Sequence, residues 1–141
     1  MIDQGLNPRS RFKCSHASAS ESLFRILCVD DDPTFRTMLK ISLESCGIEV
    51  ITASHGVDAL MQFKAFDGQF NSVVTDHDMP SMNGLTFVAS LRDRGYAGRI
   101  VIMSGRLGTD DLEQYVNHKI SGFFHKPFEV GLLAAMLLRC E

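Results

Sequence analysis

Five short runs of apolar residues recur along the chain, separated by longer segments whose apolar residues repeat every three or four positions. The runs lie at Phe24–Val29, Ile48–Ala53, 71–75, 99–103 and Gly122–His125. Continuous apolar runs are typical of strands in a parallel sheet that helices cover on both faces. Strand and helix alternate five times with short loops, which predicts an α/β fold with a doubly wound, five-stranded parallel sheet and five helices.

The helix after the first run has clear boundary signals. Asp32 suits an N-cap, Pro33 suits the first helical position because its missing N–H needs no partner there, and Gly47 is typical of a helix end. The other helices are predicted mainly from apolar spacing. The expected apolar faces consist of Val57, Leu60 and Met61 in the second helix and of Leu112, Tyr115 and Val116 in the fourth, within residues 110–118.

Composition and charge narrow the classes of function. The 141 residues are 45% hydrophobic and 22% charged, which is ordinary for a soluble globular domain. A net charge of −3 without a basic run argues against direct binding of nucleic acid. No apolar stretch approaches the roughly 20 residues of a membrane span, and the first residues lack the apolar core of a secretory signal. We therefore expect a cytoplasmic protein without membrane contact.

The chain divides into two parts. Residues 1–22 are polar and rich in serine, so we expect a flexible N-terminal extension there. Residues 23–141 are expected to form one domain. Because the sequence ends at Glu141, directly after the fifth predicted helix, we expect a stand-alone domain that acts through a partner.

Residues suited to phosphoryl transfer follow four of the five runs. Asp30 and Asp31 follow the first, Asp76 the third, Ser104 the fourth and Lys126 the fifth. A lone aspartate at a strand end is usually a cap or turn residue, but parallel strands end at one edge of the sheet, where these five would meet. Three neighbouring carboxylates repel one another, and a Mg²⁺ ion, which prefers oxygen ligands, would relieve the repulsion. Asp76 could then act as a nucleophile toward phosphorus, with Lys126 and Ser104 facing the transferred group.

These residues stand in four motifs: Val29-Asp30-Asp31-Asp32-Pro33, Asp76-His77-Asp78-Met79-Pro80-Ser81-Met82-Asn83-Gly84, Met103-Ser104-Gly105 and Lys126-Pro127-Phe128. Together they resemble the receiver domain of two-component response regulators, the CheY-like family, over most of the chain. The resemblance implies a flavodoxin-like sheet with strand order 2-1-3-4-5.

The resemblance also implies roles for the carboxylates. Asp76 would accept a phosphoryl group from the phosphohistidine of a sensor histidine kinase or a histidine phosphotransfer protein, and the product would act on an unknown downstream target. Asp31, Asp76 and the backbone carbonyl of Asp78 would hold Mg²⁺, or Mn²⁺, directly. Asp30 would contact the metal through a bound water. Such a domain catalyses only its own phosphorylation and dephosphorylation, so it is a signalling switch and not a metabolic enzyme.

Further roles follow from the same resemblance. Lys126 would bridge Asp76 and the phosphoryl group, and Ser104 would swing inward to hydrogen-bond it. Phe123 stands at the aromatic switch position, where it lacks the hydroxyl of the commoner tyrosine and must act through packing. The Lys126–Pro127 peptide bond would be cis.

Four residues around the pocket affect how this scheme would work. Asp78 and Arg106 occupy the two positions that tune dephosphorylation in the family. Asp78 could orient an attacking water or repel the phosphoryl group, and Arg106 could screen it. His77 is expected to be exposed to solvent, whereas His125, within the fifth run, is expected to tolerate partial burial.

Three alternatives compete with a receiver. A haloacid-dehalogenase-like phosphatase also uses an Asp-x-Asp motif, as in Asp76-His77-Asp78, but its nucleophile lies on the first core strand and its acidic pair comes late. A phosphorylation-independent interaction module has no need of three carboxylates in one pocket. A flavodoxin-type protein would need a phosphate-binding loop after the first strand, where this chain has Asp30-Asp31-Asp32.

Overall fold

The computed structural model describes residues 24–139, so the prediction for residues 1–22 lies outside the described part. Five parallel strands form one sheet in the order β2-β1-β3-β4-β5. The strands are β1 (Phe24–Val29), β2 (Ile48–Ala53), β3 (Ser72–Asp76), β4 (Arg99–Ser104) and β5 (Gly122–His125). The predicted doubly wound fold and its strand order are confirmed.

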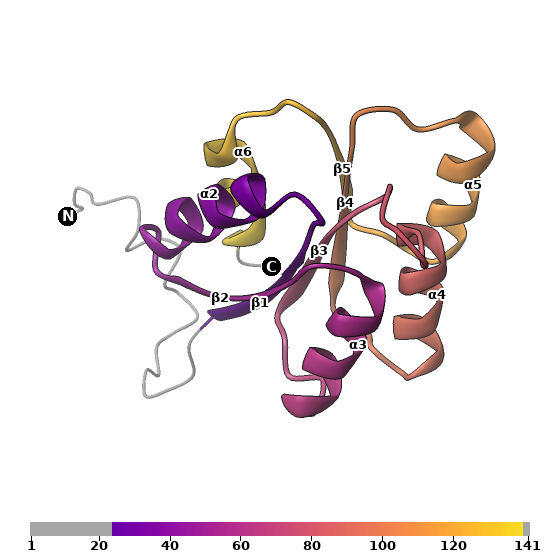
Figure 1. Cartoon of the computed structure of the whole chain (residues 1–141), viewed down its shortest axis with the longest axis horizontal. Coiled ribbons are helices and arrows are strands. Elements are labelled where there is room, and N and C mark those ends of the chain that lie inside the picture. The colour runs from indigo at the N-terminus through magenta and orange to yellow at the C-terminus, as the bar shows by residue number, and fades with distance from the viewer. Residues whose placement is uncertain (1–23, 140–141) are drawn as a thin grey trace.

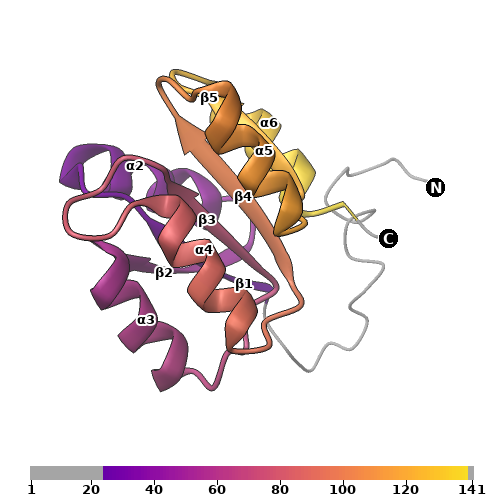
Figure 2. The ribbon, with the colours of Figure 1, turned by 90° about the vertical axis from the view of Figure 1, so that its right-hand side faces the viewer.

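Helices cover both faces of the sheet (Figure 1). Helices α2 (Pro33–Glu44) and α6 (Val130–Leu137) pack on one face, and α3 (Gly56–Ala65), α4 (Gly84–Asp93) and α5 (Thr109–Asn117) pack on the other. Figure 2 shows α4 and α5 side by side in front of the sheet. Within residues 24–139, no helix is long and apolar enough to cross a membrane.

The sheet explains why the strands read as continuous apolar runs. All five residues of β3 are buried, and so are the last four residues of β1, because each of these strands has neighbours on both sides and helices on both faces. The parallel register brings the strand ends to one edge. There Val29 pairs with Thr75, Asp76 with Met103, and Ser104 with His125.

The apolar face predicted for α3 is right only at Leu60, which is partly buried against the core. Val57 and Met61 are 49% and 66% exposed, and the helix instead buries Ala59 and Phe63. The rotation lets the Phe63 ring join an aromatic cluster beneath the sheet, where its centroid lies 5.4 Å from that of Tyr96. Burying an aromatic ring removes more apolar surface from water than burying a valine, so the cluster decides which side of the helix faces inward.

Helix α2 begins as predicted, with Asp32 as its N-cap and Pro33 in the first turn. Asp32 Oδ1 accepts hydrogen bonds from the backbone N–H groups of Thr34 (3.0 Å) and Phe35 (3.3 Å).

We expect Asp32→Ala to be about 1 kcal/mol less stable than Asp32→Asn in urea unfolding, because asparagine keeps the accepting oxygen and both variants remove the charge. Equal stability of the two variants would contradict a cap that acts through hydrogen bonds.

Candidate functional site

The edge where the strands end holds a cluster of three carboxylates. Asp30 and Asp31 directly follow β1, and Asp76 is the last residue of the neighbouring β3. One oxygen from each of the three lies within 4.8 Å of the other two. Asp30 is fully buried, Asp76 is nearly so, and Asp31 is exposed, which makes Asp31 the side of the cluster open to solvent.

The Asp30 carboxylate is held by partners on both oxygens. Its Oδ1 accepts from the backbone N–H of Asp32 at 2.8 Å, and its Oδ2 accepts from Lys126 Nζ at 2.7 Å. The backbone is held as well, since the Asp30 N–H donates to Ala53 and the Arg36 guanidinium donates to the Asp30 carbonyl. A buried carboxylate needs such partners, because desolvation of an unpaired charge is costly.

Lys126 reaches the cluster from the end of β5. Besides its contact with Asp30, its Nζ lies 3.6 Å from Asp76 Oδ1 and 4.4 Å from the centre of the Phe35 ring. Burial lowers the pKa of Lys126, but the hydrogen bond to Asp30 and the charges of Asp76 and Asp30 outweigh burial and raise it overall. The lysine is therefore a fixed positive charge beside Asp76. The Lys126–Pro127 peptide bond is cis.

The electrostatics of Asp76 favour a bound cation. Burial and then the charge of Asp30 raise the pKa of Asp76 to about 6. The charge of Lys126 lowers this pKa, whereas the charges of Asp31 and Asp78 raise it further. One lysine thus does not neutralise the carboxylates around it. Because the donor set is all oxygen and carries a negative charge, the residues present fit a divalent cation.

The residues that carry this geometry also match a known family. The sequence model of the response regulator receiver domain matches residues 26–138. The chain belongs to the response regulator receiver family. The receiver is thus a signalling domain and not a metabolic enzyme.

Relatives agree with the match. The transcriptional regulatory protein PrrA of Mycobacterium tuberculosis H37Rv is 31% identical over 111 residues, which cover 79% of this chain and 47% of PrrA. The receiver therefore spans about half the length of this curated relative. The solved structure of chemotaxis protein CheY4 of Vibrio cholerae has a TM-score of 0.76 and 27% identity, over 82% of this chain and 97% of CheY4. Response regulator TrrA of Thermotoga maritima, solved in complex with Mg(2+)-BeF, has a TM-score of 0.69 and 28% identity over 80% of this chain and 95% of TrrA.

The other predicted site residues lie on β4 and β5 and in the loops that follow β3 and β4. Ser104, the last residue of β4, is buried, and its hydroxyl donates to the Arg106 carbonyl (2.7 Å) and accepts from the Arg106 N–H (3.0 Å). The Ser104 side chain is thus bonded to the following loop and not to Asp76. Phe123 in β5 is half-buried against the core of the α3–α5 face. The side chains of Asp78 and Arg106 are exposed.

Both expectations for the histidines are wrong. His125 is exposed at the end of β5. His77 directly follows β3 and is buried, with Nδ1 2.6 Å from the Tyr115 hydroxyl and Nε2 3.4 Å from Asp111 Oδ2 in α5. The available signal in the sequence was Tyr115, the one aromatic residue of a mostly polar helix, whose hydroxyl needs a polar partner when it is buried.

Close packing around His77 explains the glycine that begins α4. A Cβ on Gly84 would lie 2.6 Å from both the Asp76 carbonyl oxygen and the Tyr115 hydroxyl, and 2.9 Å from His77 Cα. The Gly84 N–H also donates to the His77 carbonyl at 2.7 Å. The start of α4 is therefore packed closely against the backbone of Asp76 and His77.

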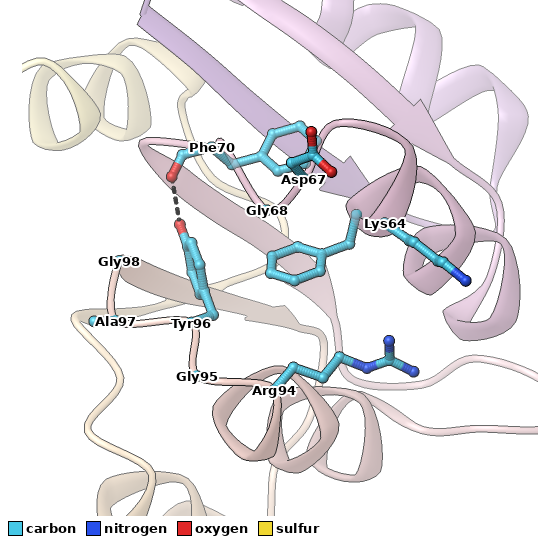
Figure 3. Close-up of a pocket in the computed structure, with 10 residues that line it drawn as sticks. Lys64, Asp67, Gly68, Phe70, Arg94, Gly95, Tyr96, Ala97 and Gly98 are labelled. Carbon is cyan, nitrogen blue, oxygen red and sulfur yellow. Dashed lines mark hydrogen bonds between the residues drawn. The ribbon is translucent and has the colours of Figure 1, made fainter.

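A hollow of about 480 Å³ lies at the opposite ends of the strands, between the C-termini of α3 and α4 (Figure 3). It contains Tyr96, whose hydroxyl donates to the Phe70 carbonyl at 3.0 Å. Phe70 and Gly98 in its wall precede β3 and β4, whereas Asp76 ends β3. The hollow is thus separate from the carboxylate cluster.

Proposed function

We propose that the receiver accepts a phosphoryl group on Asp76 from the phosphohistidine of a sensor histidine kinase or a histidine phosphotransfer protein. The observation that carries the proposal is the convergence of Asp30, Asp31 and Asp76 within 4.8 Å, with the Lys126 ammonium 3.6 Å from Asp76. A nucleophilic carboxylate, a site for a cation and a fixed ammonium are the parts that phosphoryl transfer requires.

In the transfer, an Asp76 carboxylate oxygen attacks phosphorus and the bond from phosphorus to the donor's histidine nitrogen breaks. The electron pair stays on the nitrogen, which takes up a proton, and Asp76 becomes an acyl phosphate. Lys126 stabilises the oxygens of the transferred group by its charge. Ser104 reaches that group by exchanging its hydrogen bonds with Arg106 for one to a phosphoryl oxygen, and Phe123 repacks against the space left behind.

The carboxylates would hold Mg²⁺, or Mn²⁺, in unequal ways. Asp31, Asp76 and the Asp78 carbonyl would be the direct ligands. Both oxygens of Asp30 already accept hydrogen bonds, which supports contact through a water. When bound, the metal neutralises charge that Lys126 alone leaves unbalanced. Asp78 and Arg106, both exposed beside the pocket, would set the lifetime of the acyl phosphate.

The test is the intact mass of the protein after incubation with acetyl phosphate. We expect the wild type to gain one phosphoryl group only when Mg²⁺ is present, Asp76→Asn to gain none, and Asp93→Asn, which changes an exposed aspartate at the end of α4, to behave as the wild type. A folded wild type without an adduct would instead favour a phosphorylation-independent interaction module. Continuous turnover of a simple phosphate ester would favour a phosphatase.

The wider biology of the receiver follows from the same proposal. Residues 23–141 would be the signalling domain, and its effect would pass through a downstream protein. Action as a stand-alone domain, a cytoplasmic location and the lack of direct contact with nucleic acid or membrane stay predictions.

A further inference from the structure

Helix α5 buries a single side chain against the rest of the receiver. Among the residues of α5, Tyr115 is the one that is buried, and it is completely so. Leu112 and Val116 on the same helix are exposed, which corrects the apolar face predicted from the sequence. The Tyr115 hydroxyl lies 2.6 Å from His77, the residue directly after the acceptor. The position of α5 thus depends on a contact with the acceptor loop.

The direction of the Tyr115–His77 hydrogen bond follows from its surroundings. Burial, then the charges of Asp111, Asp76 and Asp78, raises the pKa of Tyr115, so its hydroxyl keeps its proton and can donate. A neutral His77 ring that turns a protonated Nε2 toward Asp111 has an unprotonated Nδ1 to accept from Tyr115. Both ring nitrogens therefore face residues of α5, Nδ1 at 2.6 Å from the Tyr115 hydroxyl and Nε2 at 3.4 Å from Asp111 Oδ2.

The backbone of His77 is hydrogen-bonded to residues next to the carboxylate cluster, in addition to the contacts of its ring with α5. The His77 N–H donates to the Met103 carbonyl at 2.9 Å, and the His77 carbonyl accepts from Gly84 at 2.7 Å. Gly84 has no room for even a methyl group, so the His77 backbone cannot shift alone. In the sequence, His77 stands between Asp76, the proposed phosphoryl acceptor, and Asp78, whose backbone carbonyl is a proposed metal ligand.

We propose that Tyr115 is a positioning residue that couples the acceptor pocket to the exposed surface of α5 through its hydrogen bond to His77. This inference rests on the proposed function, because the signal it transmits is the charge that arrives at Asp76. A change at Asp76 acts on the adjoining loop, the loop moves the His77 ring, and the ring moves the anchor of α5. Coupling is reciprocal, so a partner that holds Leu112 and Val116 would also change cation and phosphoryl binding at the pocket.

The test compares the NMR shifts of the Leu112 and Val116 methyl groups before and after addition of Mg²⁺ and beryllium fluoride, which mimics a phosphoryl group on a carboxylate. We expect Tyr115→Phe to bind the mimic but to show a response at these methyls of about half that of the wild type or less, because it loses one buried hydrogen bond to His77. The matched control is Tyr96→Phe, which deletes the other buried tyrosine hydroxyl at the far ends of the strands and is expected to respond as the wild type (Figure 3).

A second variant separates coupling from general destabilisation. His77→Phe keeps an aromatic ring against Tyr115 but removes both nitrogens, and we expect it to reduce the response as Tyr115→Phe does. The double variant is expected to reduce the methyl response little further than either single variant, since both changes break the same Tyr115–His77 hydrogen bond. An undiminished response in Tyr115→Phe would overturn the coupling alone. Failure of the wild type to bind the mimic would overturn the proposed function, and the coupling with it.

Discussion

Replacing Lys126 with methionine is expected to lower the free energy of unfolding by about 3 kcal/mol at pH 7 in the absence of divalent cations. Asp30 is completely buried and its Oδ2 accepts from the Lys126 ammonium at 2.7 Å, so the variant leaves a buried carboxylate without its countercharge. Methionine keeps an unbranched apolar stem beside Phe35, which makes the lost charge the main change. Urea unfolding gives the free energies.

The control for Lys126→Met is Lys40→Met. Lys40 Nζ lies 2.8 Å from the Glu44 carboxylate, nearly the distance in the Lys126–Asp30 pair. The side chains of Lys40 and Glu44 are, however, each 43% exposed. We expect this control to lose about 1 kcal/mol, because solvent already screens the ion pair and the variant otherwise loses one hydrogen bond, from Lys40 Nζ to the Val50 carbonyl. Excess Mg²⁺ is expected to restore part of the stability of Lys126→Met by replacing the missing charge. Equal losses in the two variants would show that burial of Asp30 does not set the cost.

The opposite result is expected for Asp76→Asn, which should be more stable than the metal-free wild type by about 2–3 kcal/mol at pH 7. Burial and Asp30 raise the pKa of Asp76 from 3.8 to about 6 in the folded protein. Between these values the folded state binds more protons than the unfolded state, so the stability of the wild type falls as the pH rises, and the full cost is present above pH 6. Asparagine does not ionise and escapes that cost.

The advantage of Asp76→Asn is therefore expected to shrink as the pH falls and to vanish below about pH 4, where the carboxyl is protonated in both states. Urea unfolding across this pH range measures it, with Asp93→Asn as a control for loss of an exposed carboxylate. Mg²⁺ is expected to reverse the order at pH 7, since the wild type gains a bound cation and the variant lacks a ligand. A difference that does not change with pH would contradict a raised Asp76 pKa.

The sequence by itself determined the parallel sheet and the edge at which its chemistry gathers. Central strands that are covered on both faces must be apolar throughout, so they can be recognised in the sequence as apolar runs. The start of α2 can be recognised from Asp32 and Pro33, since a helix cap involves only a few neighbouring residues. Because parallel strands end together, the order of Asp30, Asp76, Ser104 and the residues after β5 along the chain was enough to place them at one edge. The strand order itself came from the family resemblance.

Only the tertiary structure decided how side chains share the space between elements. Helical spacing marks apolar faces but not how a helix is rotated. Packing of Phe63 into the aromatic cluster therefore leaves Val57 and Met61 of α3 exposed, and of the predicted residues only Leu60 packs against the core. His77 and His125 exchanged their expected environments, because burial depends on what packs opposite a residue, and Tyr115 comes from a helix 38 residues away. Likewise Lys126 lies closer to Asp30 than to Asp76, since contact between groups distant in the chain is set by packing, which no local pattern records.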